Sequence, residues 1–422
     1  MIKRYYPKLD ETVYREQLPC GLSIAVVPKP GFTRKLAYFV TDFGSIHTDF
    51  RLEGKEYHVP AGVAHYLEHK LFELPGRDVS AEFAALGANV NAFTGYDMTA
   101  YYFSCTENFE KSLELLLEFV STPYFPEESV IREQGIIDQE IGMYLDSPEA
   151  RVFDRLMEGM YRRHPIRVPI LGSEESIREI TPEILELCHG AFYAPGNMIL
   201  CVVGDVDPET VTRIADQVLG RENRAVAEKL RDWQEEMTCP EPLTRQQMEV
   251  AMPTFQLGFK CEGFPTGDAA IRAEIVGDLA AEALFGESSA LYQQMYESGL
   301  IDASFGGGFE TVDSGAMVTC GGDSPEPEKV RDTILSGVKT LLEAGIDEDS
   351  FLKMKRSALG RRIRDLDSFD STCFRICAYH FSKYDYFQFP GVYADVTRAE
   401  VYEFLTQVVT EERCALSVIT PM

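Results

Sequence analysis

Two histidines stand four residues apart in the stretch "GVAHYLEHKLFE", residues 62–73, of a chain that contains only seven histidines. On a helix, residues i and i+4 lie about 40° apart on one face, so His65 and His69 would present their imidazoles side by side. Glu68 stands next to them. This H-x-x-E-H order is the reverse of the commoner H-E-x-x-H zinc-protease helix, and it predicts a zinc site with an adjacent general base. The alternative is a histidine pair on an ordinary amphipathic helix.

A catalytic zinc ion needs three protein ligands and one open position for water, so a third ligand must come from elsewhere in the chain. Residues 127–145 predict a helix that carries Glu133 and Glu140. Seven residues apart, these two side chains would lie nearly on one face, about 20° from each other. One of them could bind the metal while the other supports a ligand, and spacing alone does not choose between them. A solvated helix face is the alternative for either residue.

The strands and helices that must position these residues can be predicted from the sequence, and their order indicates an α+β fold. Strand-like segments rich in β-branched and aromatic residues open the first half, and the histidine helix follows them. Two further strands joined by a turn come next, then two long helices with apolar residues at helical spacing, then a buried strand. In chain order, the segments outside the histidine helix are "GLSIAVV", "KLAYFVTDFGS", "GANVNAFTGYDMTAYYFSC", "NFEKSLELLLEFV", "PEESVIREQGIIDQEIGMYL" and "NMILCVVGDV".

The same order of elements recurs after a highly charged segment, residues 221–243, that contains two prolines near its end. We interpret this segment as a linker between two homologous domains, residues 1–220 and 244–422. Each domain is expected to be a mostly antiparallel sheet with helices packed on one face. The first helix of the second copy has no histidine pair, so any metal site belongs to the first domain.

Length and composition agree with this organisation and exclude several classes of partner. A chain of 422 residues exceeds the size at which one core keeps growing. The formal net charge of -28 argues against nucleic acid and anionic membranes as partners. No apolar run approaches the length of a membrane span or has signal-peptide character. The ten scattered cysteines are expected to be reduced thiols in a cytoplasmic protein.

One group of cysteines requires separate consideration as a second metal site. Cys373, Cys377 and His380 follow helical spacing and could in principle hold an ion. Aromatic residues recur on the same pattern in this stretch, so a packed helix is the better interpretation.

With these motifs the chain resembles the pitrilysin/insulinase family of inverted-motif zinc peptidases, in particular its two-domain processing-peptidase branch. The resemblance includes "GVAHYLEHKLFE", "GANVNAFTGYDMTAYYF", "REQGIIDQEIGMY" and "FYAPGNMILCVVGDVDPE", in the family's order. It is especially similar to Gram-positive bacterial members with a short insertion ahead of the motif, here "DFRLEGKEYHVP". The resemblance implies that His65, His69 and Glu140 bind one Zn²⁺ per chain and that Glu133 forms a hydrogen bond within the site.

The same resemblance implies roles for the base and for the substrate strand. Glu68 would take a proton from the metal-bound water and pass it to the leaving amine. The segment "NVNAFT" is similar to the family's substrate-binding edge strand, where Asn91 and Ala92 would pair with an extended peptide. For Asn91 the alternative is an ordinary residue at a strand end.

One part of the family's pattern is missing. Active members carry an arginine and a tyrosine in the second domain, near a pattern like S-R-L-F-x-x-V-R-E-K-R-G-L-A-Y. The matching stretch "SALYQQMYESGLIDASF" has Tyr296 at the arginine position and Asp302 near the tyrosine position. The resemblance therefore implies a heterodimer in which a homologous subunit without H-x-x-E-H supplies both groups.

The expected function is zinc metalloendopeptidase action on peptides or extended segments, with leader-peptide removal as one candidate role. The alternative within the family is a catalytically inactive structural or partner subunit. A zinc-storage or metal-sensing protein is a third possibility, but it would not need Glu68 beside the metal.

Overall fold

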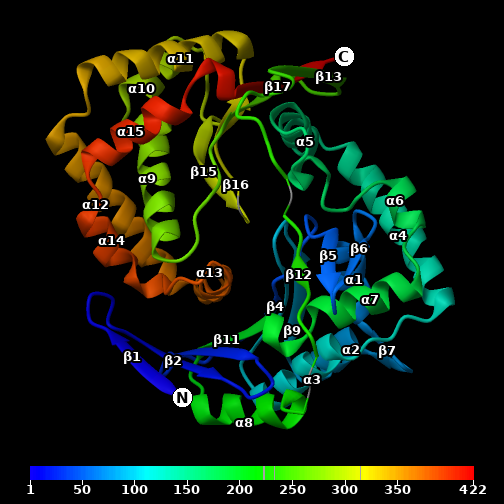
Figure 1. The fold of residues 1–422 in the computed structure, drawn as a ribbon. Helices are drawn as coiled ribbons and strands as arrows, with labels where there is room; N and C mark the ends of the chain where they lie inside the picture. The colour runs from blue at the N-terminus through cyan, green and yellow to red at the C-terminus, as the bar shows by residue number, and fades with distance from the viewer. Residues whose placement is uncertain (222–223, 232, 314) are drawn as a thin grey trace.

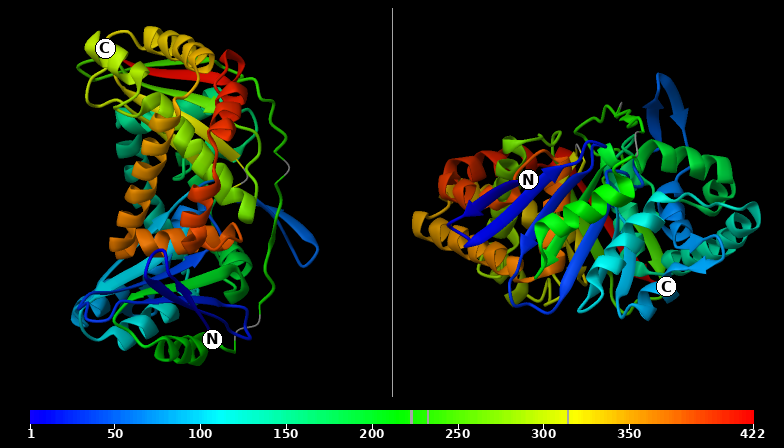
Figure 2. Two further views of the ribbon diagram at one scale, coloured as in Figure 1. Left: turned by 90° about the vertical axis from the view of Figure 1, so that its left-hand side faces the viewer. Right: turned by 90° about the horizontal axis from the view of Figure 1, so that it is seen from below.

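The computed structural model describes residues 1–221, 224–231, 233–313 and 315–422. The chain forms two lobes, and the segment that connects them runs along one side of the molecule (Figure 2). A sheet lies in each lobe, with helices packed against it (Figure 1).

The sheet of the first lobe has seven strands in the order β1-β2-β3-β11-β4-β10-β9. Strands β3 and β11 run parallel, and the other neighbouring strands run antiparallel. Strand β9 therefore lies at one edge of the sheet. The strands are β1 (Ile2–Tyr6), β2 (Glu11–Gln17), β3 (Ser23–Pro28), β4 (Lys35–Thr41), β9 (Asn89–Thr94), β10 (Thr99–Cys105) and β11 (Met198–Gly204). The sequence did not predict β1 and β2, whose side chains are mostly exposed or half-buried.

The sheet of the second lobe repeats the core of the first. Its order is β13-β17-β14-β16-β15, with β13 and β17 parallel and the rest antiparallel. We leave out β1 and β2 and number the remaining strands of each sheet by their order in the chain. Both sheets then have the spatial order first, fifth, second, fourth, third. This identity of topology confirms the predicted α+β fold with two homologous, mostly antiparallel domains. The strands are β13 (Leu243–Met248), β14 (Thr254–Lys260), β15 (Gly306–Val312), β16 (Gly315–Asp323) and β17 (Cys414–Pro421).

The helices also follow a repeated order. In the first half of the chain they are α1 (Val63–Leu71), α2 (Val79–Ala85), α3 (Phe109–Ser121), α4 (Glu127–Leu145), α5 (Pro148–Met160), α6 (Glu174–Arg178), α7 (Pro182–Phe192) and α8 (Pro208–Leu219). In the second half of the chain they are α9 (Asp268–Phe285), α10 (Ala290–Glu297), α11 (Pro327–Ala344), α12 (Glu348–Arg364), α13 (Phe369–Phe381), α14 (Phe389–Asp395) and α15 (Arg398–Val408). Helices α1 and α4 lie where the sequence predicted them.

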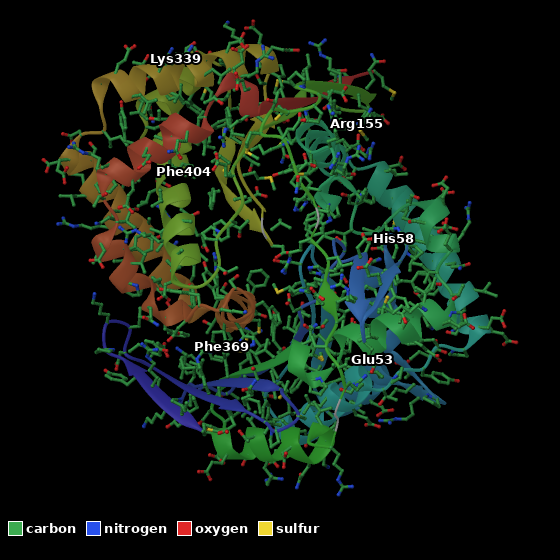
Figure 3. The ribbon with its side chains drawn as sticks, in the orientation of Figure 1. Glu53, His58, Arg155, Lys339, Phe369 and Phe404 are labelled. Carbon is green, nitrogen blue, oxygen red and sulfur yellow. The ribbon has the colours of Figure 1, made fainter. Side chains whose placement is uncertain are left out.

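Each half contributes one helix to the sheet of the other half. Helix α5 packs against β13, β14 and β17, and helix α13 packs against β4 and β11. Figure 3 labels one residue of each exchanged helix, Arg155 on α5 and Phe369 on α13. The Phe369 ring lies 5.5 Å from the ring of Phe32 in the first half. Helices from both halves therefore pack against the first sheet. The sequence predicted helices on one face of it, and α13 adds a helix from the other half.

The residues of β11 show why both faces of this sheet are covered. All seven residues of the strand are buried. Leu200 and Val202 belong to the core of the first lobe, while Cys201 and Val203 belong to the core that includes α13. The Sγ of Cys373 lies 3.8 Å from the carbonyl oxygen of Cys201 across this junction. A continuous apolar run is typical of a strand buried on both faces.

Residues 222, 223 and 232 of the predicted linker lie outside the described residues. Two of its other residues form the short strand β12 (Glu228–Lys229), which pairs with β5 (Asp49–Leu52) beside β6 (Lys55–His58). The charged sequence of this segment has no strand pattern, and its strand forms through backbone pairing with β5. Lys229 is ion-paired with Asp42 at 2.5 Å. The domain boundaries at 220 and 244 stay a proposal.

The remaining sequence predictions concern cysteines and membranes. All ten cysteines are free thiols, and Cys373 and Cys377 are buried on α13, as expected of a packed helix. Among the described residues, no helix has the length and apolar character required to cross a membrane.

Candidate metal centre

Helix α1 is held almost entirely inside the first lobe. It begins after Gly62, whose φ of 90° and close approach to the Leu171 carbonyl oxygen exclude a side chain there. The helix contacts β9, β10, α4 and α7 (Figure 1). The Tyr66 hydroxyl donates a hydrogen bond to the Val130 carbonyl of α4. This packing fixes α1 against α4, the helix that carries Glu133 and Glu140.

The structure brings His65, His69 and Glu140 together. The Nε2 atoms of His65 and His69 each lie 3.6 Å from a carboxylate oxygen of Glu140. One ligand atom from each residue lies within 4.8 Å of the others. In a tetrahedral zinc site with bonds of about 2.0–2.1 Å, ligand atoms are separated by roughly 3.3 Å. Two imidazoles and one carboxylate at these distances fit a zinc ion with one position left open.

Glu133 lies on the other side of His69. Its Oε1 is 3.0 Å from His69 Nδ1, so the Nδ1–H can donate to the carboxylate while Nε2 faces Glu140. This hydrogen bond raises the pKa of His69. Burial lowers the pKa of His65 to about 4, which keeps that imidazole in the neutral form that binds metals. Among the described residues, His65 Nδ1 has no hydrogen-bond partner.

Glu68 does not belong to the group formed by His65, His69 and Glu140. It is half-buried, and its Oε2 accepts a hydrogen bond of 2.7 Å from the Thr94 hydroxyl. Burial raises the pKa of Glu68. A carboxylate that is close to the candidate metal ligands without being one of them has the position that a general base needs.

Asn91 and Ala92 lie on the edge strand β9. They pair with Tyr102 and Tyr101 of β10, and β9 has no strand on its other side among the described residues. The Ala92 backbone N–H donates to Asn91 Oδ1 at 2.9 Å instead of to another strand. An extended peptide could replace this local bond and continue the sheet.

Sequence reasoning missed Lys70, the residue that follows His69. Its side chain is 1% exposed, and its Nζ donates to Glu73 Oε2 at 2.5 Å and to the Ser129 hydroxyl. Ser129 lies in the first turn of α4, four residues before Glu133. Lys70 therefore joins the two helices that carry the candidate ligands. The signal available in the sequence was a lysine among apolar residues of the predicted helix, in "VAHYLEHKL".

Lys70→Met should weaken zinc binding by at most about 10-fold, the lower end of what partners of metal ligands contribute, because Lys70 holds α1 against α4 without contacting a candidate ligand. Competition with a chelating dye measures this affinity on the folded variant. Arg132→Ala is the matched control, since Arg132 contacts the same Glu73 carboxylate from the exposed surface. Unchanged zinc affinity in folded Lys70→Met would show that the contact stabilises the fold alone.

Tyr296 lies on helix α10 and Asp302 follows the end of that helix, whereas α1 lies in the other lobe (Figure 1). The Tyr296 side chain is 49% exposed, and its ring stacks on Tyr292 at 5.8 Å between centroids. Asp302 accepts hydrogen bonds from the backbone N–H and the hydroxyl of Ser304. These bonds lower the pKa of Asp302, so it is an anion at neutral pH.

Comparisons with known proteins match almost the whole chain. Residues 53–174 match the family profile described as insulinase (peptidase family M16), and residues 179–358 match the peptidase M16 inactive domain. A Bacillus subtilis (strain 168) protein named uncharacterized zinc protease YmfH is 36% identical over 425 residues, covering 99% of this chain and 98% of the relative. The Caenorhabditis elegans mitochondrial-processing peptidase subunit beta is 28% identical over 208 residues, 48% of this chain and 43% of the relative. A crystal structure from Alicyclobacillus acidocaldarius, described as a "putative M16-like peptidase", has a TM-score of 0.93 and 31% identity, covering 98% of this chain and 99% of that one.

Proposed function

This chain belongs to the insulinase family, peptidase family M16, and on that premise we propose that it is a zinc-dependent metalloendopeptidase acting on peptides or extended segments. The observation that carries the proposal is the grouping of His65, His69 and Glu140 within 4.8 Å, with Glu68 on the same helix as the two histidines. Relatives named zinc proteases support the choice of metal. Leader-peptide removal is one candidate role.

His65, His69 and Glu140 would hold the zinc ion, which when bound would supply a Lewis acid for the scissile carbonyl and for water. Glu68 takes a proton from the attacking water and passes it to the nitrogen of the leaving amine. Glu133 keeps the Nδ1–H of His69 in place, so that Nε2 is the coordinating atom. The peptide is aligned along β9, by strand pairing with Asn91 and Ala92.

We further propose a heterodimer with a homologous subunit. The family's arginine and tyrosine are replaced here by Tyr296 and Asp302, and an anion at position 302 would repel the oxyanion of the tetrahedral intermediate. A subunit without H-x-x-E-H, but with the arginine and tyrosine, would supply the missing donors. The same replacement favours the second candidate function, an inactive structural or partner subunit.

Reconstitution tests both candidates. The isolated chain should contain one zinc ion and cleave a quenched-fluorescent peptide mixture slowly. Addition of the homologous subunit should raise turnover by 100-fold or more, on the order of the loss seen when one oxyanion donor is removed. Full activity of the isolated chain would refute the partner requirement. Zinc binding without hydrolysis in any combination would favour the inactive subunit.

We also propose that the protein works in the cytoplasm. Ten free cysteines, nine of them buried, suit a reducing compartment. Cell fractionation with an antibody to the chain tests this location, and recovery outside the cytoplasmic fraction would contradict it.

A further inference from the structure

The hydrogen bond between Thr94 and Glu68 joins two elements with different tasks. Glu68 lies on α1, the helix of the candidate metal ligands, and Thr94 is the last residue of β9, the edge strand. The Thr94 hydroxyl donates to Glu68 Oε2 at 2.7 Å. The hydrogen bond takes up one acceptor site of that oxygen and restricts rotation of the carboxylate. We expect the other oxygen, Oε1, to take the proton from water.

The position of Thr94 is fixed because the β9–β10 turn that follows it packs against the loop of residues 44–46. The carbonyl oxygens of Gly95 and Tyr96 accept hydrogen bonds from the backbone N–H groups of Ser45 and Ile46, at 3.1 and 3.0 Å. Gly44, just before that pair, approaches the backbone of Tyr96 so closely that a side chain there would overlap it. The turn therefore has little freedom, and the hydroxyl of Thr94 is presented to Glu68 in one place.

We propose that Thr94 is a positioning residue that sets which oxygen of Glu68 receives the proton of the reacting water. The inference rests on the proposed peptidase function. The water proton passes to Oε1 of Glu68 and then to the leaving amine, while the Thr94 hydroxyl keeps its bond to Oε2 and is not consumed. Because Thr94 also ends the strand on which the peptide would lie, substrate and base are aligned by one element.

Thr94→Val removes the hydroxyl at constant shape, and Thr94→Ser keeps it. With the zinc-loaded protein and its partner subunit, we expect Thr94→Val to lower kcat by about 10–100-fold, the scale of misplacing a catalytic group. KM, zinc affinity and the unfolding temperature should stay near those of the unmodified protein. Thr94→Ser should restore kcat to within a few-fold.

Thr99→Val is the matched control. Thr99 is paired with Thr94 across the hairpin, but its hydroxyl donates to the Phe43 carbonyl at 2.8 Å, away from Glu68. This variant should lower the unfolding temperature and leave the kcat of the folded protein unchanged.

A second readout does not depend on turnover. Calorimetry with a phosphinate peptide, a tetrahedral analogue that shares a proton with the general base, should show about 10-fold weaker binding to Thr94→Val and no change for Thr99→Val. Unchanged kcat and phosphinate affinity in Thr94→Val would overturn the proposal. So would a loss of zinc in that variant, or equal impairment of Thr94→Ser. If the unmodified protein and partner cleave nothing, the proposed function fails, and phosphinate binding still decides the role of Thr94.

Discussion

Glu68→Gln should abolish most peptide hydrolysis while the protein keeps one zinc ion per chain. Glutamine has the shape of glutamate and can still accept the Thr94 hydrogen bond through its amide oxygen, but it cannot take a proton from water. Loss of a general base costs on the order of 10²–10⁴-fold, and more when the base and the activated water act as a unit.

The measurement compares kcat/KM and zinc content of the variant and the unmodified chain, each with the partner subunit. Glu128→Gln, an exposed acid-to-amide change in the first turn of α4, is the control and should behave like the unmodified protein. Release of zinc by Glu68→Gln would contradict its assignment as a base, because it would indicate that Glu68 is a ligand.

Glu140→Ala should release zinc, whereas Glu133→Ala should weaken zinc binding by about 10–100-fold, as losses of supporting contacts do. Glu140 lies 3.6 Å from the Nε2 atoms of both histidines. Glu133 instead contacts His69 Nδ1, the nitrogen that faces away from Glu140, at 3.0 Å. Removing the first carboxylate takes away a coordinating atom, while removing the second frees the orientation of one imidazole.

Chelator competition at fixed pH measures the two affinities. Gln139→Ala, an exposed change next to Glu140 on α4, should leave the affinity unchanged. If Glu133→Ala lost more zinc affinity than Glu140→Ala, the assignment of ligand and supporting residue would be reversed.

Local periodicity in the sequence determined the helices of the candidate site and the α+β class. The four-residue spacing of His65 and His69 requires nothing beyond a helix to place them side by side, and α1 is such a helix. The common face of Glu133 and Glu140 follows from seven-residue spacing in the same way. The repeated order of strands and helices predicted the duplication, because each copy carries its own local pattern.

Contacts between distant segments decided the rest. Spacing could not choose between Glu133 and Glu140, because the choice depends on how α4 lies against α1. The Thr94 contact with Glu68 and the Lys70 contact with Ser129 span 26 and 59 residues. The apolar run of β11 predicted a buried strand, but not that a helix of the other half covers its second face. Periodicity reports which face of an element is buried, whereas its neighbours are selected by packing in three dimensions.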